Sequence, residues 1–358
     1  MKKLLPLFIL ITYIISACTN PGQESLNRIS ITDALGREIL LDEPPEKIVI
    51  AGKQTPMLAN FFYLFETANQ KISAIERRSQ SEDDFLKIID VDIESKYTLA
   101  RDAGVEQIAP LKPDVVILKS SMRETVGLGL EEVEIPVIYV DFETVDQIYR
   151  DIAVIAVLLD EEERGKELIN QYQAFKSTID AWVGQSSESP SVVIVQAQGE
   201  NGNFEISVPS ARFLQTMLIE ELGATALWLE AAQSGGWTTV NIEQVLNWDP
   251  EYLFVINYQG YALSIVDELK RDPLWQNLQA VKEKRVYAFA YDFLSWDQPD
   301  PRWILGYAWL ASCLYPDWVN ANQVIGITKT FYEKFYFLNE SEFAEIIEPR
   351  IRSYFEQT

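Results

Sequence analysis

The chain has 358 residues, of which 47% are hydrophobic and 23% are charged, a globular composition with room for two domains of ordinary size. Its net charge of −24 argues against a nucleic-acid partner, because phosphate binding needs a basic surface. The chain contains no histidine, which excludes histidine-based catalytic triads and zinc, manganese or haem sites ligated by imidazole.

Residues 1–18 are predicted to form a bacterial lipoprotein signal peptide. Two lysines precede an apolar run from Leu4 to Ile15, which is too short to be a membrane span. The run ends in Ile15-Ser16-Ala17-Cys18, which is similar to the lipobox in which the cysteine becomes the acylated first residue. Residues 19–28 are polar and are predicted to be a tether. With Cys18 acylated, Cys313 has no disulfide partner.

The first lobe is predicted over residues 29–159. Residues 29–41 alternate between polar and apolar types like a hairpin, turned at Ala34 to Arg37. Four buried strands follow, separated by helical segments: Lys47 to Ala51, Ile72 to Ile75, Val115 to Leu118 and Val137 to Val140. Strands that alternate with helices imply a mostly parallel sheet covered on both faces.

A long helix over residues 160–184 is predicted to join this lobe to a second one. Thr144 with Gln147 predicts a capping box for a helix to about Leu159, and Asp160 with Glu163 predicts another for the joining helix. A helix from Glu161 to Val183 would be roughly 34 Å long. Its apolar face repeats at helical spacing through Leu168, Tyr172, Phe175, Ile179 and Trp182, and Gly184 ends it. Because such a strut resists bending, we expect only a modest closure of the lobes on binding.

Residues 185–320 are predicted to form the second lobe. Its expected elements are strand Val192 to Gln196, a loop at Gly199 to Asn203, helix Ser210 to Leu222, strands Tyr252 to Asn257 and Arg285 to Ala290, and helix Ile304 to Leu314. Residues 321–358 show apolar positions at helical spacing and are predicted to form helices that pack on a lobe.

One sequence pattern occurs twice. Val105 to Leu118 and Ile242 to Val255 align without a gap as apolar, Glu, Gln, apolar, four variable positions, Pro, an acid and four apolar or aromatic residues. Each copy predicts a short helix, a Pro-acid turn and a strand. The fold is therefore predicted to be α/β, with two Rossmann-like lobes joined by a long rigid helix and a ligand cleft between the lobes.

These features resemble the class III binding proteins of ABC importers, the siderophore, haem and cobalamin type. The resemblance covers about residues 29–318 and includes the segment from Pro301 to Pro316, which matches the closing helix of that family. It implies an extracytoplasmic protein that captures a solute and delivers it to an ABC permease dimer with its ATPase. The lipobox predicts a lipid anchor, and we expect the protein to be a monomer. It also implies one permease-docking glutamate per lobe, Glu106 and Glu243. The alternative is that each glutamate only occupies the first turn of its helix, where the helix dipole favours an acidic side chain.

Candidate ligand-binding residues lie beyond the carboxyl ends of the predicted strands, where open α/β sheets bind ligands. In the first lobe they are Lys53, Gln54, Arg77, Lys119 and Arg123, with Arg78 beside them. In the second lobe they are Trp237, Tyr258, Tyr291, Trp296 and Arg302, with Tyr261 nearby. A basic wall facing an aromatic one suits a ligand with negative charge and flat or apolar bulk.

A metal chelate, either a ferric siderophore or a corrinoid, fits this description. An oxyanion such as molybdate or tungstate is the alternative within the same fold, and it would need the basic wall and little of the aromatic one. No cofactor, resident metal or catalytic residue is predicted, although direct ligation of iron by Tyr258 and Tyr291 stays open. The absence of histidine puts haem and bare metals in doubt.

An exported carbohydrate-active enzyme is the alternative from another class. Asp292, Asp297 and Asp300 could supply its carboxylates, and Trp296 and Trp303 a sugar platform. Against it, the three acids lie within one short loop, whereas glycosidase carboxylates face each other across a cleft. A sensor or adhesin of the same fold, without an importer, is a further alternative.

Overall fold

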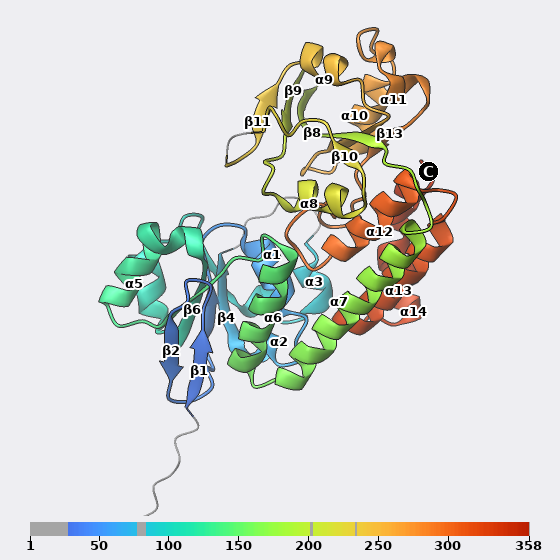
Figure 1. The fold of residues 1–358 in the computed structure, drawn as a ribbon. Helices are drawn as coiled ribbons and strands as arrows, with labels where there is room; N and C mark the ends of the chain where they lie inside the picture. Colours follow the sequence, from blue (N-terminus) through green and yellow to red (C-terminus); the bar gives the residue numbers. More distant parts are fainter. Residues whose placement is uncertain (1–27, 77–83, 201–202, 233–234, 358) are drawn as a thin grey trace, which may run out of the picture.

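The computed structural model describes residues 28–76, 84–200, 203–232 and 235–357. It has two α/β lobes, as predicted (Figure 1). The predicted signal peptide with Cys18, and also Arg77, lie outside the described residues. Within the described part, no helix combines the length and the apolar character that crossing a membrane requires.

The first lobe is built on a five-stranded sheet in which every neighbouring pair is parallel. Its order is β5-β4-β3-β6-β7, with bounds β3 Ile48–Ile50, β4 Ile72–Glu76, β5 Tyr97–Leu99, β6 Val115–Lys119 and β7 Val137–Val140. The predicted hairpin forms as β1 (Ile29–Thr32) and β2 (Glu38–Leu41), and its turn joins β7 through a hydrogen bond from Ala34 N to Tyr139 O of 2.9 Å. The strands β3, β6 and β7 are almost entirely apolar, and their side chains are buried on both faces of the sheet, which explains why the sheet lies between helices.

The helices of this lobe are α1 (Thr55–Phe62), α2 (Ala68–Lys71), α3 (Leu86–Ile89), α4 (Val105–Ile108), α5 (Leu128–Glu132) and α6 (Val145–Leu159).

The second lobe contains a mixed sheet of order β11-β9-β8-β12-β13, with β10 also paired to β8. Its strands are β8 Ser191–Glu200, β9 Asn203–Val208, β10 Thr225–Ala226, β11 Thr238–Val240, β12 Tyr252–Ile256 and β13 Val286–Ala288. Gly199 and Asn203, which are predicted as loop, instead pair within an antiparallel hairpin of β8 and β9. The residues that follow, Phe204 to Val208, alternate between apolar and polar types and form a strand.

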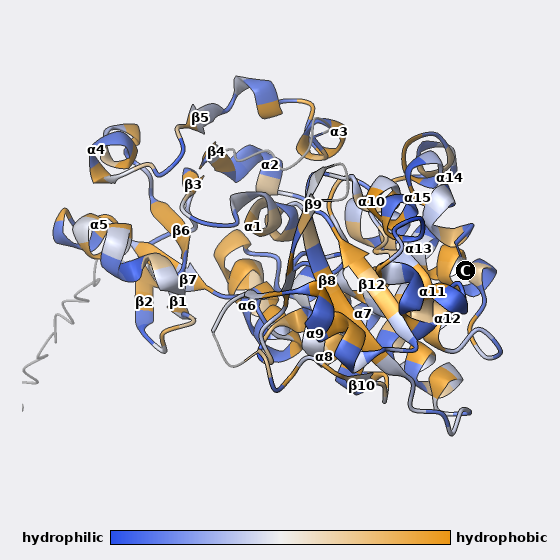
Figure 2. Cartoon of the chain, turned by 90° about the horizontal axis from the view of Figure 1, so that it is seen from above, coloured by the Kyte–Doolittle hydropathy of each residue, from blue (hydrophilic) through white to orange (hydrophobic). Residues whose placement is uncertain are grey.

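The helices that follow in the second lobe are α8 (Leu214–Glu221), α9 (Ile242–Trp248), α10 (Ala262–Leu269), α11 (Gln279–Lys282) and α12 (Trp303–Leu314). Figure 2 shows the apolar strands β6, β8 and β12 in the interior of their lobes.

The two copies of the sequence repeat occupy equivalent places, as the pattern predicts. The strands that they supply, β6 and β12, are each the fourth in the order of their sheet, and each pairs in parallel with the lobe's first central strand, β3 or β8. In both copies the residue before the proline has a left-handed backbone, with φ of 51° at Lys112 and 40° at Asp249.

The acid of each repeat ties down the neighbouring strand. Asp114 Oδ2 accepts the backbone N–H groups of Glu46 and Lys47, both at 2.8 Å, just before β3. In the second copy, Glu251 Oε2 accepts the backbone N–H of Ser191 at 2.7 Å and its hydroxyl at 3.1 Å, at the start of β8. Each acid therefore satisfies donors that a parallel sheet leaves unpaired at the start of a strand.

The joining helix is α7 (Glu162–Val183), about 33 Å long at 1.5 Å per residue. The predicted capping role of Asp160 is wrong, because Asp160 ends α6 with φ of 61°, whereas a capping residue at the start of a helix needs an extended backbone. Glu161 precedes α7 instead, and its carboxylate accepts the N–H groups of Glu66 and Thr67 in the first lobe.

The C-terminal residues form α13 (Ala321–Tyr336), α14 (Glu340–Glu342) and α15 (Glu348–Phe355), so the tail is helical as predicted. Helix α13 lies alongside α7 and α12 (Figure 1).

We expect Asp114→Ala and Glu251→Ala each to lower the free energy of unfolding by about 1 to 2 kcal/mol, because each removes a charged acceptor from two hydrogen bonds. Urea denaturation measures the change. Glu220→Ala, which removes an exposed acid on α8, is the control. An equal loss in the control, or no loss at either repeat acid, would contradict the strand-tying role.

Candidate functional site

The loop after β3 presents an exposed lysine at the carboxyl edge of the first sheet. Gly52 has φ of 88°, and its N–H donates to the buried carboxylate of Glu76 at 2.8 Å. The chain then passes Lys53, which is exposed and forms no ion pair with any residue in the described ranges. Gln54, half-buried with φ of 56°, leads into α1. The loop is thus fixed at its base while the ammonium of Lys53 faces solvent.

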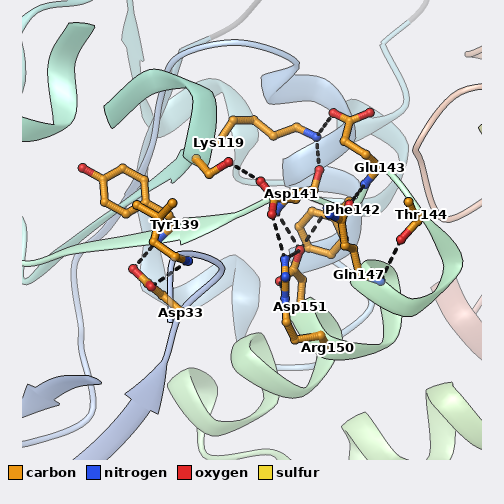
Figure 3. Close-up of polar contacts among 12 residues, drawn as sticks. Asp33, Lys119, Tyr139, Asp141, Phe142, Glu143, Thr144, Gln147, Arg150 and Asp151 are labelled. Atoms are coloured by element: carbon orange, nitrogen blue, oxygen red, sulfur yellow. Dashed lines mark hydrogen bonds and ion pairs between the residues drawn. The ribbon is translucent and has the colours of Figure 1, made fainter. Parts of the chain in front are cut away.

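Lys119, at the end of β6, is engaged within the protein instead of facing solvent. Its side chain is 3% exposed, and its ammonium donates to Glu143 Oε1 at 2.6 Å and to the backbone carbonyl of Asp141 (Figure 3). Burial lowers the pKa of Lys119, and the carboxylate of Glu143 opposes that shift. The prediction that Lys119 lies open to a ligand is therefore wrong, because a neighbouring loop supplies its counter-ion.

That loop connects β7 to α6 and is held by its own network. The N–H groups of Asp141 and Phe142 donate to Asp151 Oδ2 at 2.7 and 2.9 Å, and Arg150 pairs with both Asp141 and Asp151 (Figure 3). Burial raises the pKa of Asp151, and its bonds to Arg150 and to the backbone oppose the rise. Together with Lys119 and Glu143, the network contains three carboxylates and two cations. It therefore offers no spare positive charge to an anion.

Arg123 is also paired internally, at 3.3 Å from Glu124 and 3.9 Å from Glu131. Of the predicted basic wall, Lys53 remains exposed and unpaired among the described residues, while Arg77 and Arg78 lie outside them.

The second lobe carries an aromatic cluster of Phe213, Trp237 and Tyr258. Tyr258 lies two residues beyond the end of β12, and the ring of Trp237 packs edge-on against it at 6.3 Å and against Phe213 at 6.1 Å. All three residues are partly exposed. The predicted residues Trp237 and Tyr258 are thus brought together at the carboxyl edge of this sheet.

The hydroxyl of Tyr258 donates to Asp297 Oδ2 at 3.0 Å. Asp297 is fully buried and also accepts from Gln215 on α8 and from Ser295. Burial, reinforced by the Asp297 carboxylate, raises the pKa of Tyr258 well above its ordinary value. The hydroxyl of Tyr258 is therefore held by a buried carboxylate, which competes with a metal ion for it.

Tyr291, three residues beyond β13, is half-buried, and its ring lies in van der Waals reach of Gly260, which has φ of 88°. A side chain at residue 260 would meet that ring at 3.7 Å. Tyr261, the next residue after Gly260, is exposed.

Trp296 and Arg302 do not line a ligand site, contrary to prediction, because both side chains are completely buried. Trp296 lies against Gly306 at the start of α12, and its indole N–H donates to Asp292 at 3.0 Å. Arg302 lies between two carboxylates, 3.2 Å from Asp292 and 2.7 Å from Asp300, with its guanidinium 4.3 Å from the centre of the Phe85 ring. A position beyond the end of a strand is therefore not enough to predict ligand contact, because the loop directs these two side chains into the protein interior.

The carboxylates considered for a glycosidase are buried in the same way. Asp292, Asp297 and Asp300 are each at most 4% exposed, and each accepts hydrogen bonds from protein groups. They are therefore structural. Within the described ranges, no group of three or more acidic or cysteine side chains is arranged to hold a metal ion.

Glu106 and Glu243 are both exposed in the first turns of equivalent helices, α4 and α9. In the second copy, Asn241 caps the helix by accepting the N–H of Gln244 at 2.8 Å. Two similar anions are thus presented by two equivalent segments.

Phe213 and Glu143 are the residues of these sites that sequence reasoning missed. Phe213 lies within a segment predicted as helix, but its backbone is extended and α8 begins one residue later. Glu143 follows β7, and the strand-end rule that selected Lys119 would have found it if acids as well as cations had been considered.

Comparison with known proteins gives consistent matches over most of the chain. A family model described as periplasmic binding protein matches residues 67–291. The molybdate-binding protein MolA of Haemophilus influenzae is 24% identical, over 86% of this chain and 90% of its own length. The Fe(3+)-citrate-binding protein YfmC of Bacillus subtilis is also 24% identical, over 79% of this chain and 87% of its own.

Solved structures share the fold. A periplasmic solute binding protein from Veillonella parvula superposes with a TM-score of 0.72 at 23% identity, covering 91% of this chain and 99% of that one.

We expect Arg302→Met to lower the free energy of unfolding by about 3 to 5 kcal/mol, because it leaves two buried carboxylates without their cation. Chemical denaturation checks this. If the variant keeps its stability and loses only ligand affinity, Arg302 contacts the ligand and its structural role is contradicted.

Proposed function

The chain belongs to the periplasmic binding protein family, and from this premise we propose that it captures an iron chelate outside the cytoplasmic membrane and delivers it to an ABC permease. The observation that best supports a chelate is the partly exposed cluster of Phe213, Trp237 and Tyr258 beside the carboxyl edge of the second sheet. Ligands of open α/β sheets bind at that edge. Aromatic rings favour a solute with flat or apolar surface over a small hydrated ion.

The iron is proposed to arrive with its own ligands. The chain contains no histidine. The hydroxyl of Tyr258 already donates to the buried carboxylate of Asp297. A chelator that already satisfies the metal leaves the protein to bind the outside of the complex, through Lys53 and the aromatic cluster. The chain accordingly acts as a carrier, without catalysis.

A molybdate-type oxyanion is the second candidate, favoured by the similarity to MolA over most of both chains. A compact dianion needs several donors at once to replace its water. Of the predicted ligand-binding cations in the described part of the first lobe, Lys119 and Arg123 form ion pairs with carboxylates of the protein, and Lys53 does not. The chelate is therefore the better fit.

We further propose that Glu106 and Glu243 dock on the permease. Equivalent anions on two equivalent lobes suit a partner with twofold symmetry. Acylation of Cys18 would keep the monomer at the membrane. The docking proposal rests on the exposed position of the two glutamates, and the anchoring proposal rests on the sequence of residues 15–18.

We expect a ferric catecholate siderophore, which is anionic and carries aromatic rings, to quench the tryptophan fluorescence of the purified protein saturably, and molybdate to bind more weakly. Ferric ion without chelator should produce no visible iron-tyrosinate band, because the hydroxyl of Tyr258 is engaged by Asp297. Tighter binding of molybdate would support the oxyanion, and a tyrosinate band would support direct ligation.

Trp237→Ala should weaken chelate binding by about fivefold or more, since removing a packed ring costs about 1 kcal/mol. Trp248→Phe, at a partly buried position on α9, is the matched control and should keep its affinity. Equal affinity of the two variants would contradict a role for the aromatic cluster.

The double charge reversal Glu106→Arg and Glu243→Arg should abolish uptake of the solute by cells and leave its affinity unchanged. The control reverses two other exposed acids, one in each lobe, Glu132 and Glu220. Uptake assays and titration separate the two effects. Uptake that survives the reversal, or affinity that falls with it, would argue against docking by these residues.

A further inference from the structure

The C-terminal helices contact the first lobe at one end. On α13, the hydroxyl of buried Tyr336 donates to the backbone carbonyl of Asn60 in α1 at 3.2 Å. The Tyr336 ring meets that of Phe85, also in the first lobe, edge-on at 4.8 Å. This segment follows the region that matches the family model, which ends at residue 291.

At its other end the same segment contacts the second lobe. Ala288 N donates to the side-chain oxygen of Gln357 at 2.8 Å, and the amide nitrogen of Gln357 donates back to Ala288 O at 3.3 Å. Because β13 is an edge strand, this amide takes the place of a neighbouring strand. Phe355 packs edge-on against Trp296 at 6.4 Å.

Just before Tyr336, the segment also binds the strut and the chain that enters α12. Arg164 on α7 donates to the carbonyl of Lys334 at 2.7 Å, and Phe335 packs edge-on against Tyr172 at 4.7 Å. Tyr332 accepts from the Nε of Arg302 at 2.9 Å. One helical segment is thus bonded to the first lobe, the strut and the second lobe.

We propose that residues 321–357 act as a brace that fixes the angle between the two lobes. A rotation of one lobe against the other must break the contact of Tyr336 with Asn60 or that of Gln357 with Ala288, and must separate packed aromatic rings. Packed interiors resist such gradual deformation. The stiffness of the molecule therefore resides in this brace as well as in α7. The proposal goes beyond solute transport and concerns the free chain, whatever its ligand.

The test measures the distance between the lobes without any ligand. Nitroxide labels are placed on exposed positions through Gln107→Cys on α4 and Asn247→Cys on α9, with Cys18→Ser, while Cys313 is buried. Pulsed electron-spin resonance gives the distribution of inter-label distances. Tyr336→Ala with Gln357→Ala releases both ends of the brace. The matched control, Glu333→Ala with Lys334→Ala, changes exposed side chains of the same helix.

A narrow distribution in the parent and control, together with a broadened or shifted one in the released variant, supports the brace. The same narrow distribution in all three overturns it, provided that circular dichroism shows a folded released variant. If that variant does not fold, Tyr336→Phe with Gln357→Ala replaces it, and an unchanged distribution again overturns the proposal. Because no solute is added, failure here leaves the proposed transport function untouched.

Discussion

The buried guanidinium of Arg302 is the constraint on which the junction of the molecule depends. Burying a charge is costly unless it is paired and hydrogen-bonded, and here Asp292 and Asp300 supply the pairing. Asp300 also accepts from Asn60 of the first lobe at 2.6 Å, and Tyr332 of the C-terminal helices bonds to Asp292. The first lobe, the approach to α12 and the tail are therefore held by one set of charges. The guanidinium of Arg302 also lies over the Phe85 ring, which adds a cation–π contact with the first lobe.

Around this junction, the two lobes repeat one arrangement. Each repeat places its strand in the same position of the sheet, and each acid, Asp114 or Glu251, ties the start of the adjacent strand. The carboxyl edges then differ in chemistry. The first sheet presents Lys53 and a closed network around Lys119, whereas the second presents aromatic rings. Two similar sheets, one with a lysine and the other with aromatic rings at its carboxyl edge, suit a solute that has both charge and apolar surface.

Local patterns in the sequence predict the architecture well, because buried parallel strands are continuous apolar runs and the repeat specifies its own turn. The sequence predicts a loop where β8 and β9 form a hairpin, because Gly and Asn are typical of both. The site was predicted less well. Strand ends identify Lys53 and Tyr258, but the same rule selects Lys119 and Arg302, whose charges are neutralised by acids distant along the chain or in the adjoining loop. Which cation faces solvent depends on such tertiary pairing, which spacing does not reveal.

We propose that the solute is held between the carboxyl edges of both lobes. Hydrogen exchange of the purified protein with and without a ferric catecholate siderophore tests this most directly, because amides covered by a ligand exchange more slowly. We expect slower exchange in residues 52–54 of the first lobe and 257–261 of the second, with little change in α7. Protection confined to one lobe, or located away from both edges, would contradict it.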